Sequence, residues 1–174
     1  MTAISSRSAA HAAPCVQIKT AKVTGRRKLH FTSLGDMLAD AEMLCSMKPV
    51  HALGNWQLGR ALEHLARTID MSLDGARFKA PWYIRLLGPL FKKRLLSRPM
   101  SPGFRLPANA AKFLIPEDEC ELHEALRHLR TAVTRSLATT HRHSSPVFGH
   151  LTSDEWNQLH FRHAELHLSF FVPG

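Results

Sequence analysis

The sequence predicts an all-α protein folded as a four-helix bundle, with a long proline-rich basic insert between the second and third helices. Leucine and alanine are abundant and there is a single tyrosine, so the composition favours helices over strands. Apolar residues recur at helical spacing in four separate segments. A chain of 174 residues is long enough to form one domain with its own core.

The first two helices are recognised from their ends and their apolar stripes. Thr32 or Ser33 can cap the first helix, which is expected to end near Lys48, just before a proline. The second helix is expected to follow a glycine, with Asn55 as its candidate cap, and to fade over residues 73–75. Both segments place leucines on one face, as a core-facing helix requires.

A connection at residues 76–116 separates the second helix from the third and contains six prolines. Within it, residues 82–96 are expected to form a short helix that breaks at Gly88-Pro89. Nine Lys and Arg residues and no acid lie between residues 75 and 116. The insert can be interpreted as a surface for anionic membranes or acidic ligands, or as a lid whose apolar side joins the core. We favour the lid.

The last two helices complete the predicted bundle. The third is expected over residues 117–137, where acidic residues at its start suit the positive end of a helix. Residues 152–155 have the pattern of a capping box, so the fourth helix is expected to begin there and to end near Pro173.

The domain organisation and the compartment follow from composition. Residues 1–28 are predicted to be a flexible basic tail with a short strand-like patch at residues 16–23, and residues 29–174 a single domain. No secretory signal and no transmembrane segment is evident, and the three cysteines are scattered, so a cytoplasmic location is expected. The excess positive charge lies in the tail and the insert, so no specific nucleic-acid surface is predicted.

Two histidines four residues apart, His163 and His167, lie within an apolar stripe of the last predicted helix. Such a pair can bind one metal ion. Alternatively, each ring is buried and satisfied by hydrogen bonds. A third ligand would have to come from another helix, and His64 is the best-placed candidate. His160 lies at the edge of the stripe, as a spare ligand, a hydrogen-bond partner of a ligand or a rim residue, and we favour the last two.

Two sequence segments resemble the DinB-like (YfiT-like) superfamily of metal-dependent proteins. They are Gly54-Asn-Trp56-Gln-Leu-Gly-Arg-Ala-Leu-Glu-His64-Leu and the run from Phe148 through Trp156 to His167. Together with Arg98-Pro-Met-Ser-Pro-Gly-Phe104, these segments are similar to an uncharacterised bacterial branch, and the resemblance covers residues 26–174.

The resemblance implies a DinB-like bundle in which His64, His163 and His167 hold a divalent metal, with Zn or Ni ahead of Fe or Mn. Some members of the superfamily are thiol transferases that use a low-molecular-weight thiol. The long basic insert distinguishes this branch from them.

The leading interpretation is therefore a metal-binding protein acting as a metal-dependent thiol transferase or hydrolase on an unidentified small molecule. His160 or Trp56 would lie near the substrate, and a homodimer is compatible with this interpretation. The alternative is a non-enzymatic binding or scaffold bundle whose core histidines carry no metal.

Overall fold

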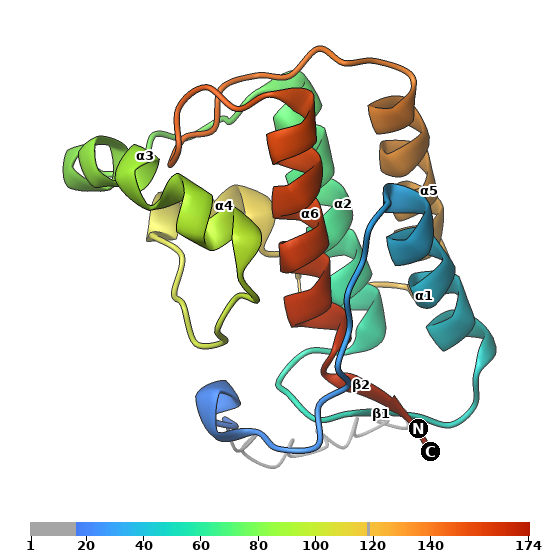
Figure 1. The fold of residues 1–174 in the computed structure, drawn as a ribbon. Helices are drawn as coiled ribbons and strands as arrows, with labels where there is room; N and C mark the ends of the chain where they lie inside the picture. Colours follow the sequence, from blue (N-terminus) through green and yellow to red (C-terminus); the bar gives the residue numbers. More distant parts are fainter. Residues whose placement is uncertain (1–16, 118) are drawn as a thin grey trace, which may run out of the picture.

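The computed structural model describes residues 17–117 and 119–174, and within them the protein is mostly helical (Figure 1). The described part of the chain contains six α-helices, a short 3-10 helix and a two-stranded sheet. Their bounds are η1 (Thr20–Lys22), α1 (Leu34–Ser46), β1 (Val50–Ala52), α2 (Leu58–Asp74), α3 (Trp82–Ser97), α4 (Ala108–Leu114), α5 (Leu122–Leu137), α6 (Ser153–Leu168) and β2 (Phe171–Pro173).

Four long helices, α1, α2, α5 and α6, pack against one another around a shared apolar core (Figure 1). Leu62 on α2, Leu129 on α5 and Leu168 on α6 are fully buried in it. Their stripes recur at the spacing of a helix that buries one face. This core holds α2 and α6 side by side, which fixes the relative position of the histidines they carry.

Capping boxes set the first residues of α1 and α6, where the sequence predicts a cap at Thr32 or Ser33 and a capping box, respectively. The Ser33 hydroxyl accepts from the backbone N–H of Asp36, whose carboxylate accepts from the backbone of Ser33 in return. Thr152 and Glu155 do the same for α6. By contrast, α2 begins at Leu58, and the predicted cap Asn55 instead forms two hydrogen bonds with the backbone of Ile18.

The sheet is a feature that the all-α prediction lacks. The last helix ends at Leu168, not near Pro173, and the chain continues as β2, which pairs antiparallel with β1. Val50 lies opposite Pro173 in this pairing. Strands of three residues are too short to produce the alternating pattern by which strands are recognised.

The insert and the helix after it differ from their predicted limits. α3 continues through Pro89 without the predicted break, and the insert contains a further helix, α4, which was not predicted. α5 begins at Leu122 because Glu121, not Glu117, caps it. The Glu121 carboxylate accepts from the backbone N–H groups of His123 and Glu124.

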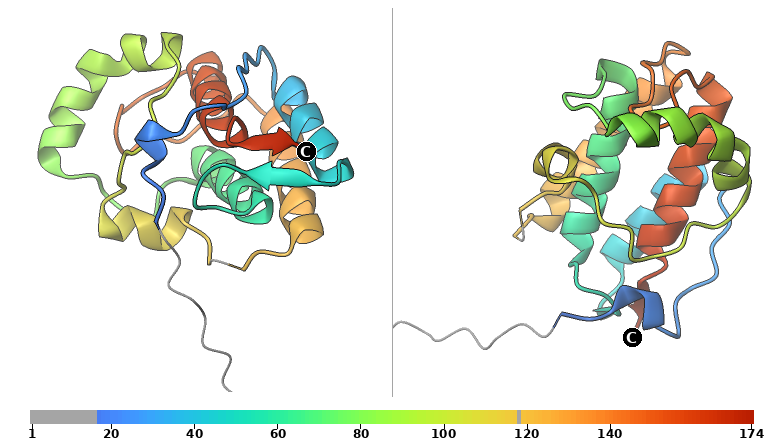
Figure 2. Two further views of the ribbon diagram at one scale, coloured as in Figure 1. Left: turned by 90° about the horizontal axis from the view of Figure 1, so that it is seen from below. Right: turned by 90° about the vertical axis from the view of Figure 1, so that its left-hand side faces the viewer.

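The interpretation of the insert as a lid whose apolar side joins the core is wrong for α3. α3 lies on the outside of the molecule, crosswise to α6 (Figure 2). Most of its large apolar side chains face solvent, with Trp82, Leu86 and Leu90 each more than three-fifths exposed. A lid over the core would bury this face.

Residues 17–28, the second half of the predicted tail, contact the helices. Arg27 forms a bidentate ion pair with Asp40 at 2.7 Å and also donates to the Leu168 carbonyl. Within residues 17–23 the chain forms η1 and not the predicted strand-like patch. Residues 1–16 lie outside the described part, so the domain boundary after residue 28 stays a prediction. No helix of the described residues is long and apolar enough to cross a membrane.

Candidate metal centre

One nitrogen from each of three histidines converges between α2 and α6. His64 comes from α2, and His163 and His167 come from successive turns of α6. The Nε2 atom of His163 lies 3.1 Å from the Nε2 atoms of both His64 and His167. The three ligand atoms all lie within 4.8 Å of one another, as a shared cation would require. These are the three histidines that the sequence singled out.

A backbone carbonyl fixes the orientation of His64. Its Nδ1 atom lies 2.7 Å from the carbonyl oxygen of Leu114, the last residue of α4. Because a carbonyl can only accept, Nδ1 must carry the proton. In the neutral ring the lone pair is therefore on Nε2, which faces the other two histidines. Leu114 performs the role of the outer partner that metal-binding histidines usually have.

His163 has a similar but longer outer contact. Its Nδ1 atom lies 3.5 Å from the hydroxyl oxygen of Thr68, and that hydroxyl donates its own hydrogen to the Leu65 carbonyl at 2.8 Å. The oxygen thus presents a lone pair to Nδ1, which favours a proton on Nδ1 and a free Nε2. Lone pairs of His64 and His163 then face each other, an arrangement that a cation between them stabilises.

The surroundings keep all three rings neutral, which is the form that binds metals. Burial lowers the pKa of His163 and of His167 well below the usual value, and the neighbouring histidines lower it further. Burial also lowers the pKa of His64; the hydrogen bond to Leu114 opposes this effect, and the charges of Arg67 and Arg60 add to it.

The nitrogen separations suit a small divalent cation. Zinc–imidazole bonds of about 2.0–2.1 Å in tetrahedral geometry place two ligand nitrogens about 3.3 Å apart. Two of the three separations are 3.1 Å, close to this value, and the third pair lies within 4.8 Å. Imidazole nitrogen is also a ligand for Ni, Fe and Cu. Three protein ligands leave a position open, which is typical of catalytic and not of structural zinc sites.

Trp56 forms one side of the site. Its ring stacks on His167, with centroids 5.1 Å apart, and meets His64 edge-on at the same distance. The guanidinium of Arg60, in the first turn of α2, lies over the Trp56 ring at 5.1 Å from its centroid. The structure thus places Trp56 directly against two of the three candidate ligands.

His160 is in the interior and not at the rim. Only 3% of the residue is exposed, its Nε2 lies 3.2 Å from the Ser72 hydroxyl, and its ring stacks on Trp156. Burial lowers its pKa to about 3, and the charge of Arg142 contributes. His160 does not belong to the group of converging nitrogens.

Two residues that support the site were not predicted. The Leu114 carbonyl is a main-chain atom, so its side chain gives no signal of this contact. Thr68 is four residues after His64 on α2, and this spacing puts both on one face of the helix. A search for polar residues one turn from each candidate ligand would have found Thr68.

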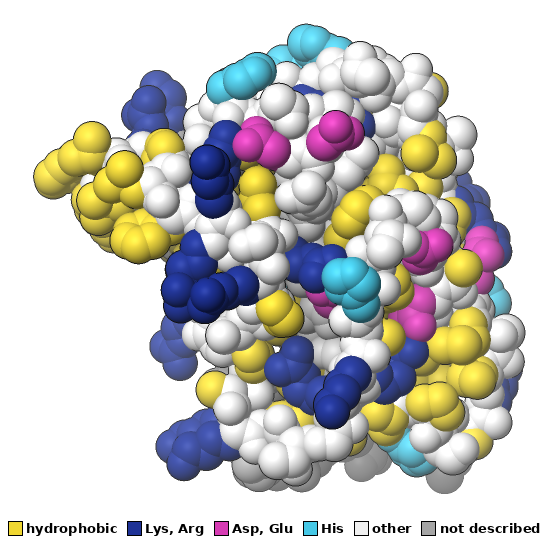
Figure 3. Space-filling view, viewed as in Figure 1, with side chains coloured by type: hydrophobic (Ala, Val, Ile, Leu, Met, Phe, Trp, Pro, Cys, Tyr) yellow, Lys and Arg dark blue, Asp and Glu magenta, His cyan; other side chains and the backbone are white. Residues whose placement is uncertain are grey.

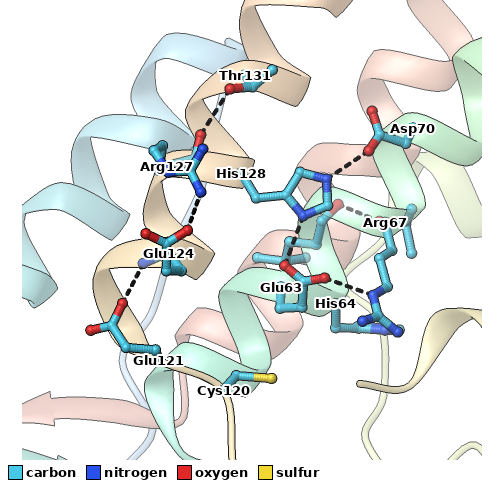
Figure 4. A network of polar contacts seen from close by, with 12 residues as sticks. Glu63, His64, Arg67, Asp70, Cys120, Glu121, Glu124, Arg127, His128 and Thr131 are labelled. Carbon is cyan, nitrogen blue, oxygen red and sulfur yellow. Dashed lines mark hydrogen bonds and ion pairs between the residues drawn. The ribbon is translucent and has the colours of Figure 1, made fainter. Parts of the chain in front are cut away.

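A second polar network lies on the other side of α2, between α2 and α5 (Figure 4). His128 lies 2.7 Å from a carboxylate oxygen of Glu63 and 2.8 Å from one of Asp70. Arg67 donates to the other Glu63 oxygen at 2.8 Å. Glu63 is adjacent to His64 in sequence, but these contacts hold its carboxylate toward α5, so the candidate ligands among the described residues are the three histidines.

Comparison with known proteins places the chain in a family without assigning a reaction. No curated protein and no solved structure matches it. The model of one family, described as protein of unknown function (DUF1569), matches residues 23–174. The match covers both histidine-bearing helices and the insert. Because it extends over most of the sequence, the chain belongs to the DUF1569 family.

Proposed function

We propose that this protein is a DinB-like four-helix bundle that binds a divalent metal through His64, His163 and His167. The observation that supports this proposal most strongly is the convergence of three Nε2 atoms, two pairs of them 3.1 Å apart. The tautomers favoured by Leu114 and Thr68 direct lone pairs, not protons, toward the common centre. Zn or Ni fits this all-imidazole set best, ahead of Fe or Mn.

The reaction class that suits such a site is thiol transfer or hydrolysis. A bound divalent metal supplies Lewis acidity, which lowers the pKa of a thiol or a water molecule so that its anion exists near neutral pH. Trp56 offers a flat apolar wall beside the ligands, against which a small substrate can be held. His163 and His167 are mostly buried but keep a partly exposed side, and we propose that a small molecule approaches the site from there. A low-molecular-weight thiol is the co-substrate we propose.

The bundle assignment draws on the order and packing of the elements. α1, α2, α5 and α6 are the four long helices that share the core, and the long insert lies between the second and the third of them. The sequence resemblance to the DinB-like superfamily covers the same helices. We further propose a bacterial, cytoplasmic protein with one domain after residue 28, which can form a homodimer.

Metal analysis of the untagged, purified protein tests the central proposal. Elemental analysis should find close to one divalent metal per chain. The variants His64→Ala, His163→Ala and His167→Ala should each lose most of it, because two ligands hold a metal far less tightly than three. His123→Ala, which changes an exposed histidine on α5, is the matched control and should keep full occupancy.

The competing function is a non-enzymatic binding or scaffold protein whose core histidines carry no metal. It predicts substoichiometric metal in the wild type and no difference between the triad variants and His123→Ala. Full occupancy in a His163→Ala/His167→Ala double variant would also exclude the triad as the site. Thiol-transfer and hydrolysis assays are then informative only for protein that has first been shown to hold metal.

A further inference from the structure

The outward face of α3 is apolar, which is the reverse of an ordinary surface helix. Trp82, Leu86 and Leu90 follow one another at intervals of four residues and are 75%, 66% and 76% exposed. Tyr83, Leu87 and Phe91 form a second row beside them and are also exposed. In the space-filling view this face is an apolar projection at one side of the molecule (Figure 3). Contiguous exposed apolar patches of this kind usually mark an interaction site.

The opposite face of α3 is fixed to the rest of the protein, so the helix cannot simply roll its apolar side inward. A Cβ added at Gly88 would overlap the carbonyl oxygen of Val147, so the two backbones touch there. Lys92 forms an ion pair with Glu155 on α6 at 2.7 Å, and Leu96 is buried. These contacts lie on one side of the helix and direct the two apolar rows outward.

The charges around the patch are of one sign. Nine Lys and Arg residues and no Asp or Glu lie between residues 75 and 116. Lys93, Arg94 and Arg98 are exposed at the C-terminal end of α3, next to the apolar rows. Figure 3 shows Lys and Arg side chains bordering the projection. An interfacial helix that binds anionic lipid has the same combination of Trp, Phe and Leu with Lys and Arg.

We propose that the outward face of α3 binds the surface of an anionic lipid bilayer. The apolar rows would enter the boundary between headgroups and acyl chains, and the cations would contact acidic headgroups. A second copy of the chain fits less well, because the exposed cations Lys93, Arg94 and Arg98 beside this face would meet the like charges of the other copy. The face also projects from the molecule, as suits a flat, deformable surface. Since no described helix can span a bilayer, the attachment is peripheral. This inference does not depend on the metal site.

Cosedimentation of the full chain with vesicles tests the proposal. The protein should bind vesicles of phosphatidylcholine mixed with phosphatidylglycerol, and should bind pure phosphatidylcholine much more weakly. The variant Leu86→Asp/Leu90→Asp should lower the affinity at least about tenfold, because it removes apolar contact and adds repulsive charge. Leu137→Asp is the matched control, since Leu137 is 68% exposed on α5, far along the chain from the insert, and it should bind normally.

Charge and fluorescence give two independent measurements. Lys93→Gln/Arg94→Gln should weaken binding roughly 25-fold, at about fivefold per cation near the surface. Raising the salt to about 0.5 M should weaken binding of the wild type similarly, because it screens headgroup charge. Binding should also shift tryptophan emission to the blue, and Trp82→Phe should abolish this shift while the protein still sediments.

Four outcomes would overturn the proposal. The first is no vesicle binding at low salt by folded protein, with melting temperatures confirming the fold. The second is equal binding by Leu86→Asp/Leu90→Asp and Leu137→Asp. The third is a concentration-dependent dimer in ultracentrifugation that Leu86→Asp/Leu90→Asp dissociates, which would assign this face to a second copy. Capture of an acidic protein without vesicle binding would count against the proposal as well.

Discussion

The two ring nitrogens of His64 have different partners, and the difference explains how a polar ring fits into an apolar core. Nδ1 donates to the Leu114 carbonyl at 2.7 Å, which satisfies one buried polar atom. An unsatisfied buried polar atom costs about 1–3 kcal/mol. Nε2 lies 3.1 Å from the Nε2 atom of His163, which presents a lone pair of its own. A shared cation satisfies all three nitrogens at once, which a hydrogen-bonded pair cannot do.

The ion pairs of His128 predict a pH-dependent contribution to stability. Burial lowers the pKa of His128, but hydrogen bonds and charges from Glu63 and Asp70 raise it by more, so the net pKa in the folded protein is raised. The unfolded value is about 6.5. Stability from this residue is therefore fully present below about pH 6.5 and is lost as the pH rises through the folded pKa.

We accordingly expect His128→Gln to lower the free energy of unfolding by about 1–2 kcal/mol at low pH and by much less at high pH. Urea unfolding at about pH 5.5 and about pH 9 measures the difference. His123→Gln, an exposed change on the same helix, should have little effect at either pH. An equal loss for His128→Gln at both values would show that its charge does not contribute.

At the scale of elements, α2 packs tightly against the segment before α5 at a glycine. A Cβ at Gly59 would lie 2.5 Å from the carbonyl oxygen of Cys120, which is a backbone atom and cannot swing aside. Glycine is normally the poorer helix former, by about 1 kcal/mol relative to alanine. Here the steric overlap is expected to outweigh that preference, because α2 and the segment before α5 would have to separate.

Gly59→Ala should therefore lower the free energy of unfolding by about 1–3 kcal/mol, the usual cost of overpacking. Gly35→Ala is a matched control: Gly35 is likewise the second residue of its helix, and an added Cβ there would approach only the Ser33 side chain, at 3.5 Å. That change should be neutral or stabilise by up to about 1 kcal/mol. Chemical unfolding measures the free energy of unfolding of both variants. Equal changes for Gly59→Ala and Gly35→Ala would contradict the predicted steric overlap at Gly59.

Elements whose ends are coded by local side chains were predictable. The capping boxes of α1 and α6 depend on residues three positions apart, so the sequence displays them directly. Asn55 looked like a cap for the same local reason, but its amide pairs with Ile18, 37 residues away. The strands β1 and β2 pair only through long-range contacts and are too short for a periodic pattern, so they were missed.

The candidate site was predictable to a similar extent. His163 and His167 share a face because of their spacing, and His64 was placed on the right helix. The prediction that His160 lies at the rim was wrong. How much of α6 is buried depends on how α2 packs against it, and on α2 Ser72 contacts His160. The position of α4, which brings the Leu114 carbonyl to His64, depends on the folding of the whole insert and has no local code.

At the scale of the whole molecule, the three histidines join two helices that are far apart in sequence. His64 and His163 are separated by 99 positions, and His64 is also tied to α4. In the unfolded chain, bringing the three nitrogens together would cost much conformational entropy because of this separation. A metal that needs all three therefore binds the folded protein almost exclusively, and such a ligand stabilises the fold by mass action.

Removing the metal should accordingly destabilise the entire protein and not only the site. A free metal concentration about 100 times the Kd adds about 2.7 kcal/mol of stability. For a domain of this size that amounts to about 5–10 °C in Tm. We expect chelation to lower the Tm of the wild type and of His123→Ala by this amount, and to leave His163→Ala/His167→Ala, already at the lower Tm, unchanged. Thermal unfolding of each protein with and without chelator measures this change in Tm. An unchanged Tm after chelation of protein that had held one metal per chain would mean that the metal binds somewhere other than between α2 and α6.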